Sequence, residues 1–323
     1  MNEEVGMDKK FIVDFQENET ISGYFCVLTK SLKKTKDGKD YISVELTDKT
    51  GKIDAKIWDR AAEFNDKFDQ GDAVAVKGQI VSYNEMPQIK IDLIRQASEE
   101  IDKPHGFDLA DLIPTTSKDI DQMWSDVQQT IESIGEEPLK SLARSVYQKN
   151  EIQLKRHPGS MVLHHAYLGG LLEHIQSMCN LAVHVCENYP ELNRDLVLTG
   201  VLLHDIGKLS ELKFTTVGSY SDEGYLLGHI VIGRDMLREA AAQIANFPER
   251  QLLKLEHILL SHHGKLEWQS PREPLFPEAL AVYYIDEIDT RLFQMKHEIE
   301  ADSSDGNWTS RNNYFKRSLY KGE

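Results

Sequence analysis

The spacing of apolar residues changes once along the chain, and this change constrains the fold more than any other feature. In residues 11–97, apolar and polar residues alternate in short runs such as 52–58, and turn-forming stretches such as 36–39 separate the runs. From Ser117 onward, apolar residues recur every three or four positions. Alternation is typical of half-buried strands, and the longer period is typical of amphipathic helices. The sequence therefore predicts a multidomain protein, with an all-β domain followed by an all-α domain.

The strand-like part has the order of a known small barrel. A short helical stretch near 61–68 separates the third run from the fourth, which is the arrangement of an OB-fold. Such barrels often hold single-stranded nucleic acid, but others bind proteins or sugars, so the fold alone does not identify the ligand. The five predicted strands cover residues 20–28, 41–46, 52–58, 72–83 and 88–94.

Three boundaries follow from the composition. We expect the OB-fold domain to cover 11–97 and a linker to cover 98–116, where the periodicity is lost and Pro104, Gly106 and Pro114 gather. The helical domain is expected over 117–300, with Ser117 as a plausible cap of its first helix. A basic tail, 301–323, closes the chain and is either a solvated tail or a binding patch.

Charge and aromatic residues indicate how the barrel could hold a nucleic acid. The net charge of −16 argues against wholesale electrostatic binding, but lysines crowd residues 30–39, where the first long loop is expected. Tyr41 and Tyr83 are candidates to stack on bases, with a core position as the alternative, whereas the core is favoured for Trp58. We predict a non-specific grip on a single strand, and the substrate-binding candidates are Lys33, Lys34, Lys36, Tyr41 and Tyr83.

The cellular compartment is also predicted. No apolar run reaches the 18 residues of a membrane span, and the N-terminus lacks the basic start and apolar segment of a secretion signal, so we expect a cytoplasmic protein with no membrane partner. Cys26, Cys179 and Cys186 are sparse and odd in number, and we expect them to be small buried hydrophobes rather than a disulfide.

A histidine and an aspartate, His204 and Asp205, end an apolar run. Imidazole and carboxylate together suit divalent first-row ions, although such a pair alone is more often a helix-end aspartate beside a backbone-bonded histidine. Of the twelve histidines, only His105 lies outside residues 157–297. Polar groups in apolar helix segments are costly unless something satisfies them, and a shared metal would satisfy several. The candidates are His174, His204, Asp205, His229, His262, His263 and Asp286.

These residues carry a resemblance. His174, the pair His204-Asp205 and the late Asp286 resemble the H…HD…D signature of the HD-domain metal-dependent phosphohydrolases. With an OB-fold in front, the wider set of motifs looks like the bacterial 3'-5' exoribonuclease family called YhaM, and the similarity covers nearly the whole chain. The motifs are His-His-Ala-Tyr at 164–167, Gly-Gly-Leu-Leu-Glu-His at 169–174, Leu-His-Asp-Ile-Gly-Lys at 203–208, Gly-His-Ile at 228–230 and Ser-His-His-Gly-Lys-Leu-Glu at 261–267.

The resemblance implies a distribution of ligands. His174, His204, Asp205 and Asp286 are expected to bind one divalent ion, while His229, His262 and His263 match positions that hold a second ion in binuclear relatives. Asp289 lies one helical turn from Asp286 and could compete with it, but the superfamily pattern favours Asp286. We expect His184, His257 and His297 to be exposed or structural.

The ligands suggest the chemistry. A divalent ion lowers the pKa of bound water from about 16 to near 7 and neutralises a phosphate oxygen. The expected catalytic residues are Asp205, which can bridge two ions, and Lys208, which could contact a phosphate oxygen or merely cap a helix end. His164 and His165 either contact substrate phosphate or are structural. We expect manganese as one or two ions, although iron, cobalt and zinc suit the same ligands.

The resulting hypothesis is a metal-dependent enzyme that degrades single-stranded RNA to nucleoside monophosphates. The residues alone indicate phosphodiester hydrolysis, and the 3'-5' direction is implied by the resemblance. Single-stranded DNA remains a possible substrate, because no residue announces a contact to the 2'-hydroxyl. Two alternatives stay open, an HD-type nucleotide phosphohydrolase and a non-catalytic single-strand-binding protein. The sequence does not predict the oligomeric state.

Overall fold

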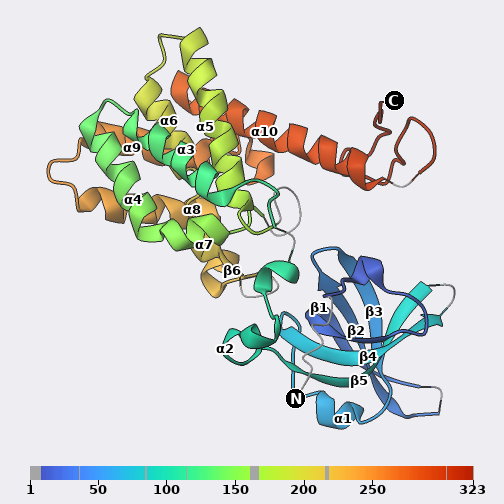
Figure 1. The fold of residues 1–323 in the computed structure, drawn as a ribbon. Helices are drawn as coiled ribbons and strands as arrows, with labels where there is room; N and C mark the ends of the chain where they lie inside the picture. Colours follow the sequence, from blue (N-terminus) through green and yellow to red (C-terminus); the bar gives the residue numbers. More distant parts are fainter. Residues whose placement is uncertain are drawn as a thin grey trace. The chain divides into compact units, whose positions relative to one another are not determined.

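The computed structural model describes residues 9–322 except 36, 84–85, 114, 161–166, 215–217 and 303, and it does not describe the side chains of 213–219. The chain forms two compact units, which are described separately below (Figure 1). The first comprises Met1–Thr115 with Phe214–Ser219, and the second comprises Thr116–Lys213 with Tyr220–Glu323. None of the helices in the described part is long and apolar enough to cross a membrane.

The first unit is a closed barrel of five strands, as predicted. The strands follow one another around the barrel in the order β1-β2-β3-β5-β4, in which β3 and β5 pair in parallel, and the antiparallel pairing of β4 with β1 completes the circle. The helix α1 (Ala61–Phe64) lies between the third and fourth strands, which confirms the OB-fold order. The strands are β1 (Thr20–Lys34), β2 (Asp40–Asp48), β3 (Gly51–Ile57), β4 (Ala73–Tyr83) and β5 (Met86–Gln96).

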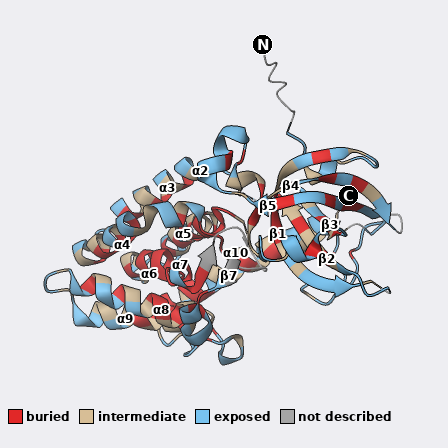
Figure 2. Cartoon of the chain, turned by 90° about the horizontal axis from the view of Figure 1, so that it is seen from below, coloured by how far each residue is buried: buried red, intermediate tan, exposed pale blue. Residues whose placement is uncertain are grey.

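Alternation along the strands builds the barrel core. In β2, Ile42, Val44 and Leu46 are buried, whereas Tyr41 and Ser43 between and beside them are only partly covered. This is the pattern expected when one face of each strand points into the barrel. Figure 2 shows the resulting mixture of buried and exposed positions along each strand.

The lysines of residues 30–39 lie partly in a strand, which differs from our expectation. We placed these lysines in a loop, but β1 continues to Lys34, so Lys30, Lys33 and Lys34 are strand residues. Their side chains therefore have fixed directions. Lys30 points to the barrel end and donates to the carbonyl oxygens of Asn65 and Phe68, while Lys33 is exposed. Lys36 lies outside the described residues.

Short helices occupy much of the segment that we expected to be a linker, 98–116. Asp102, at the end of α2 (Glu99–Asp102), accepts hydrogen bonds from Arg95 at 2.9 Å and from the Tyr24 hydroxyl at 3.2 Å. Phe107 packs edge-on against the ring of Tyr24, with 5.1 Å between the ring centroids. These contacts fasten the segment to the barrel. The described residues of the first unit also include 3-10 helices at Ile12–Asp14, Lys103–His105 and Leu109–Asp111.

The second unit is mostly helical and is organised around α6 (Arg194–Leu203). Its residues from Leu196 to Leu203 are all buried, and a helix that is apolar on every side belongs in the middle of a domain. The first helix is capped by Asp119 rather than by Ser117. The other helices are α3 (Ile120–Glu132), α4 (Glu137–Arg156), α5 (Gly170–Asn188), α7 (Lys208–Glu211), α8 (Asp222–Ala242), α9 (Glu249–Ser261), η4 (Leu266–Trp268) and α10 (Pro277–Ala301).

One element of this part of the chain is not helical. The strands β6 (Leu212–Phe214) and β7 (Gly218–Tyr220) pair as a two-stranded ribbon between α7 and α8. No convincing strand pattern is present in the sequence here, because three-residue strands are too short to show alternation. The described part of the stretch expected to be all-α is thus helical apart from this ribbon, most of which groups with the first unit.

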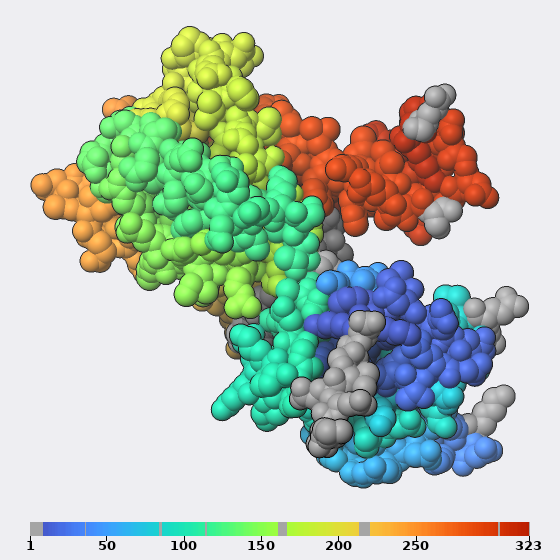
Figure 3. Space-filling view, in the orientation of Figure 1, coloured from blue at the N-terminus to red at the C-terminus, as the bar shows by residue number. Residues whose placement is uncertain are grey.

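The C-terminal segment is folded. The Lys321 ammonium lies 2.6 Å from the Asp302 carboxylate, and an isolated bridge pairs Trp308 with Tyr320. Thr309 and Leu319 are buried between them. In the space-filling view the segment is a solid lobe at the end of α10 (Figure 3). Part of the basic stretch that we predicted as a tail is therefore used to fold the segment.

The three cysteines are buried, and none of them forms a disulfide. Burial raises the pKa of the Cys26 thiol and of the Cys179 thiol to about 12. Neither thiol ionises at neutral pH, which agrees with the expectation that they act as small hydrophobes.

Candidate metal centre

The centre is built where α6 ends. His204 caps the helix, Asp205 follows, and Gly207 leads into α7. A Cβ atom at position 207 would lie 2.0 Å from the carbonyl oxygen of His229, so only glycine allows the start of α7 to pass so close to α8. The glycine of the motif at 203–208 thus brings a second histidine-bearing helix to the site.

Five histidines of the cluster share one orientation. In each of them Nδ1 faces a hydrogen-bond acceptor, so Nδ1 carries the proton and the lone pair of Nε2 points away from that acceptor. This is the tautomer that a metal-binding histidine needs. The acceptors are the carbonyl oxygens of Val201 for His204 (2.8 Å), Leu259 for His262 (2.7 Å) and Trp268 for His263 (3.0 Å), and the carboxylates of Asp289 for His174 (2.7 Å) and Glu211 for His229 (3.0 Å).

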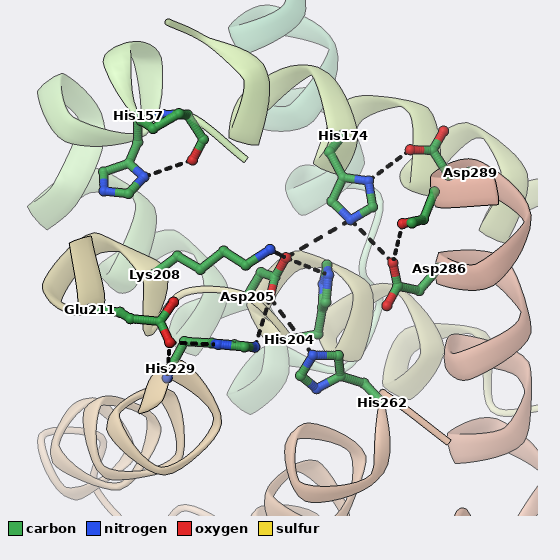
Figure 4. A network of polar contacts seen from close by, with 12 residues as sticks. His157, His174, His204, Asp205, Lys208, Glu211, His229, His262, Asp286 and Asp289 are labelled. Atoms are coloured by element: carbon green, nitrogen blue, oxygen red, sulfur yellow. Dashed lines mark hydrogen bonds and ion pairs between the residues drawn. The ribbon is translucent and has the colours of Figure 1, made fainter. Parts of the chain in front are cut away.

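Asp205 lies at the middle of this arrangement, with its two oxygens facing opposite groups (Figure 4). Oδ2 lies 3.2 Å from Nε2 of His204 and 3.9 Å from Nε2 of His174. Oδ1 lies 3.6 Å from Nε2 of His229 and 3.7 Å from Nε2 of His262. One carboxylate therefore contributes an oxygen to each side.

Two groups of potential ligands result. His174, His204 and Asp286 offer three donor atoms within 4.8 Å of one another, and so do His229, His262 and His263. The two groups flank Asp205, and their imidazole and carboxylate donors suit a divalent first-row ion in each.

The burial of the donor atoms tests whether metals fit. The Nε2 atoms of His204, His229 and His262 and the Oδ1 atom of Asp205 are buried and have no hydrogen-bond partner among the residues that the structure describes. Each such atom costs about 1–3 kcal/mol when nothing satisfies it. The cost of the four atoms is compensated when cations bind between them. The residues therefore fit a metal centre.

The protonation states of His262, His263 and Asp205 also agree with metal binding. Burial and the neighbouring His263 hold the pKa of His262 well below its ordinary value, and burial and His229 lower that of His263. Burial by itself would raise the pKa of Asp205, but Lys208 and His204 hold it well below the usual range. Neutral imidazoles and an ionised carboxylate are the forms that coordinate metals.

Lys208 is buried at the centre rather than exposed at a helix end. Its ammonium lies 2.6 Å from Oδ2 of Asp205, and its side chain is 9% exposed. The alternative of a surface lysine is therefore wrong. The residue places a positive charge in the pocket beside both ligand groups.

The structure separates the roles of Asp286 and Asp289, which the sequence left in competition. Asp286 faces Nε2 of His174 at 3.4 Å, whereas Asp289 faces Nδ1 of the same ring and also accepts from the Ser177 hydroxyl. Burial would lower the pKa of His174, but Asp286 and Asp289 raise it to about 9. Asp289 orients the His174 ring through Nδ1, whereas Asp286 lies on the Nε2 side, where a metal would bind.

We expect Asp289→Asn to weaken metal activation by about tenfold, the lower end of the 10- to 100-fold cost of losing such an orienting partner. The amide keeps the acceptor but loses the charge that makes His174 a stronger ligand. The measurement is the metal concentration for half-maximal activity, and excess metal should restore the maximal rate. Asp126→Asn, on α3 and outside the cluster, is the control; equal effects of both variants would contradict the assigned role.

Glu211 and Gly228 form a second orienting device, which the sequence analysis missed. Gly228 has a φ of +72°, and this non-helical residue kinks α8 just before His229. The kink lets the His229 backbone amide donate to Glu211 at 2.8 Å, while the same carboxylate accepts from the ring. The Gly-His pair at 228–229 is the only sequence signal for this geometry.

A pocket of about 290 Å³ opens on the centre and is lined by Asp205, Lys208, His262, His263 and Asp286, together with residues of α10 and the C-terminal segment. A larger pocket of about 1000 Å³ lies on the barrel, but it contains none of the clustered ligands. Chemistry that depends on the cluster therefore belongs to the smaller pocket.

Of the barrel residues predicted to bind nucleic acid, Lys33, Lys34, Tyr41 and Tyr83 are described, and they lie on the outer face of the barrel. Lys33 pairs in register with Tyr41, and Tyr41 stacks on Trp58 with ring centroids 4.6 Å apart and an interplanar angle of 22°. Trp58 is 38% exposed, so our expectation of a core position is wrong. Trp58 directly follows the last residue of β3, and beyond the end of a strand the alternation no longer determines whether a side chain faces the barrel interior or the solvent. Lys34 lies 3.7 Å from Asp40, and Tyr83 is exposed.

Other histidines lie apart from the cluster or outside the described residues. His184 is exposed beside Glu187, His257 accepts from the Leu275 amide, and His297 stacks on Phe293. His164 and His165 fall outside the described residues, so their predicted contact with phosphate stays a prediction.

Comparison with known proteins gives matches for both units. The family model of the HD domain matches residues 171–291, and that of an OB-fold nucleic acid binding domain matches 27–96. The chain is 32% identical to the 3'-5' exoribonuclease YhaM of Bacillus subtilis (strain 168) over 291 residues, which are 90% of this chain and 91% of that protein. The second OB-fold domain of replication protein A from Methanococcus maripaludis is 24% identical, with a TM-score of 0.24, over 28% of this chain and 96% of that domain.

Proposed function

Because the chain belongs to the YhaM family of 3'-5' exoribonucleases, we propose that it is a metal-dependent enzyme that removes nucleoside monophosphates from the 3' end of single-stranded RNA. The observation that carries the proposal is the set of buried donor atoms around Asp205, which has the composition of a phosphohydrolase metal centre. The barrel supplies a second element that an RNA-degrading enzyme needs, a surface for the strand.

We assign one divalent ion to His174, His204 and Asp286 and a second to His229, His262 and His263. Asp205 offers one oxygen to each, which supports a bridging role. Such ions, when bound, supply an activated water and neutralise charge on the phosphate. Manganese is the ion we propose, because mixed oxygen and imidazole ligands suit it.

The remaining groups of the pocket act on the substrate. Lys208 is held by Asp205 at 2.6 Å and lines the same pocket, which supports a contact between its ammonium and a non-bridging phosphate oxygen. The ionised form of Asp205 keeps this cation in place before substrate arrives. We therefore assign catalytic roles to Asp205 and Lys208.

The barrel face around Tyr41 is proposed to hold the RNA strand. Lys33, Tyr41 and Trp58 form a row that combines a cation for the phosphate backbone with a stacked aromatic pair for bases. Lys34 and Tyr83 are proposed to extend this surface. We propose the same for Lys36, which lies outside the described residues. The enzyme is proposed to act in the cytoplasm, where disulfides are rare, and none of its three cysteines forms a disulfide.

Trp58→Ala should weaken binding of a single-stranded RNA 20-mer by about 5- to 150-fold, because one base–aromatic stack contributes about 1–3 kcal/mol. The affinity can be measured by fluorescence anisotropy with a labelled RNA. Tyr189→Ala, which removes an exposed tyrosine of the helical unit, should leave the affinity unchanged. An unaltered affinity of the Trp58 variant would show that the RNA uses another surface.

The function is tested with one RNA 20-mer that is labelled in separate samples at its 5' and 3' ends. We expect the 3' label to leave at once as a mononucleotide, while the 5'-labelled RNA shortens as a ladder in the presence of manganese. The same sequence as DNA measures the preference for RNA. Hydrolysis of a nucleoside triphosphate with the RNA left intact, or RNA bound but not shortened, would overturn the proposal.

A further inference from the structure

The wall of the small pocket beside the metal centre is formed by an aromatic and cationic cluster. Arg291, on α10, places its guanidinium 5.2 Å from the ring centroid of Trp268 and 5.3 Å from that of Tyr314. Its Nη1 atom also donates to the Tyr314 hydroxyl at 2.7 Å. We call Trp268, Arg291 and Tyr314 the rim cluster. All three line the pocket that contains Asp205 and Asp286.

The rim cluster is held in place from several sides. The backbone amide of Tyr314 donates to Glu298 at 2.9 Å, and Arg291 lies 3.3 Å from Glu287. Three consecutive elements, η4, α10 and the C-terminal segment, thus converge at the pocket. Yet 41% of Tyr314 and 31% of the Arg291 side chain remain exposed, so the cluster keeps surface available for a ligand.

Two buried polar residues lie beside the rim cluster. Thr290 and Gln294 are 9% and 3% exposed, and both line the pocket. An aromatic face, a guanidinium and a buried amide are together what proteins use to hold a nucleotide, by stacking on the base, pairing with phosphate and hydrogen bonding to polar edges. The pocket volume of about 290 Å³ is at the small end of ligand sites and suits one nucleotide rather than several.

We infer that the rim cluster binds the 3'-terminal nucleotide of the substrate. Trp268 stacks on its base, and Arg291, positioned by the Tyr314 hydroxyl, pairs with its phosphate. This inference rests on the proposed function, since it places the terminal phosphodiester beside the metal ligands. It also makes the C-terminal segment part of the substrate site, because that segment supplies Tyr314.

Two small phosphodiesters separate nucleotide binding from chemistry. The p-nitrophenyl ester of thymidine 5'-monophosphate contains a nucleoside, whereas bis(p-nitrophenyl) phosphate does not. For Trp268→Ala, we expect the ratio of kcat/KM for the nucleoside ester to that for the simple diester to fall by roughly 10- to 100-fold, because only the nucleoside ester carries a base. Arg291→Ala should lower kcat/KM for both diesters, because both contain the phosphate. The Trp268 variant keeps the backbone carbonyl that orients His263. An unchanged ratio would overturn the inference.

Tyr314→Phe tests the positioning role. It removes only the hydroxyl that holds Arg291, so we expect a rise in KM for the nucleoside ester of about three- to tenfold, in line with the loss of one hydrogen bond of ordinary strength between partly exposed groups, and no change in kcat. Tyr320→Phe is the matched control, because it alters another exposed tyrosine of the same segment. Equal effects of the two changes would contradict a specific role of Tyr314.

Binding without turnover distinguishes this inference from the proposed function. Uridine 5'-monophosphate and ribose 5-phosphate can be titrated calorimetrically into the metal-loaded wild type and the Arg291→Ala and Trp268→Ala variants. We expect Trp268→Ala to weaken only the nucleotide, and Arg291→Ala to weaken both ligands. If the affinities follow this pattern but the wild type shortens no RNA, the exonuclease proposal fails while the inference that the rim cluster binds a nucleotide is supported. Equal affinities in wild type and variants would overturn the inference that the rim cluster binds the nucleotide.

Discussion

Asp205→Asn is expected to slow RNA hydrolysis by more than about 100-fold, beyond the 10- to 100-fold loss typical of residues that only orient a ligand. The substitution keeps the shape of the side chain but removes the charge that serves both ligand groups, and it turns one of the two oxygens into a donor. That NH2 group cannot bind a cation, and where it faces the Lys208 ammonium it would replace the present attraction with a contact between two donors. The measurement is the single-turnover rate on end-labelled RNA.

This variant also leaves Lys208 buried without its partner, and breaking a buried ion pair costs about 3–5 kcal/mol. Its folding must therefore be checked by thermal unfolding. Asp286→Asn is a second test that leaves the Asp205–Lys208 pair intact and should also lose activity strongly. RNA affinity should change little in either variant, because the proposed strand-binding row is on the barrel. Activity near that of the wild type in both folded variants would refute the assigned centre.

Two manganese ions per chain are expected after saturation and removal of excess metal, and chelation should abolish activity and lower the melting temperature. Binding to the folded state alone stabilises a protein by about 2.7 kcal/mol at a metal concentration one hundred times Kd. The ions also remove the cost of the buried Nε2 atoms and of Asp205 Oδ1. Elemental analysis gives the count, and calorimetric unfolding gives the stabilisation.

Single-ligand variants assign each ion to its group. His263→Ala should reduce the count to about one, since it removes a donor only from the group with His229 and His262. Asp286→Asn should remove the other ion, and His257→Ala, whose Nε2 accepts from a backbone amide, should retain both. A wild-type count of one ion, or the same residual ion in both ligand variants, would show that the two groups do not act as separate sites.

Local patterns predicted the elements well where they were long. The alternation at 41–46 identified a barrel strand, and the apolar run before His204 identified the helix on which the centre is built. The prediction was wrong for Trp58, which follows the end of a strand, and for the lysines of β1, because a strand of 15 residues continued through a stretch that looked like a loop. Charged residues on an exposed strand face do not differ in pattern from those in a turn.

The distant residues of the pocket could not be predicted at all. Arg291 had a helical context but no distinguishing signal, and Tyr314 was part of a stretch that composition describes only as basic. Their contact at 2.7 Å depends on how the segment after α10 folds around Asp302. Periodicity in the sequence reports on single elements, so it does not predict which residues of neighbouring elements contact each other.

The sequence by itself determined which elements form and which residue types are available as ligands, because periodicity fixes the side of an element that is buried and the chemistry of imidazole and carboxylate fixes what they can bind. Only the tertiary structure decided that Asp286 faces the front of His174 and Asp289 its back, and that Asp205 presents one oxygen to each group of histidines. These distinctions depend on distances of a few ångströms between atoms on different helices. Packing of the helices around α6 sets those distances, and no local pattern contains them.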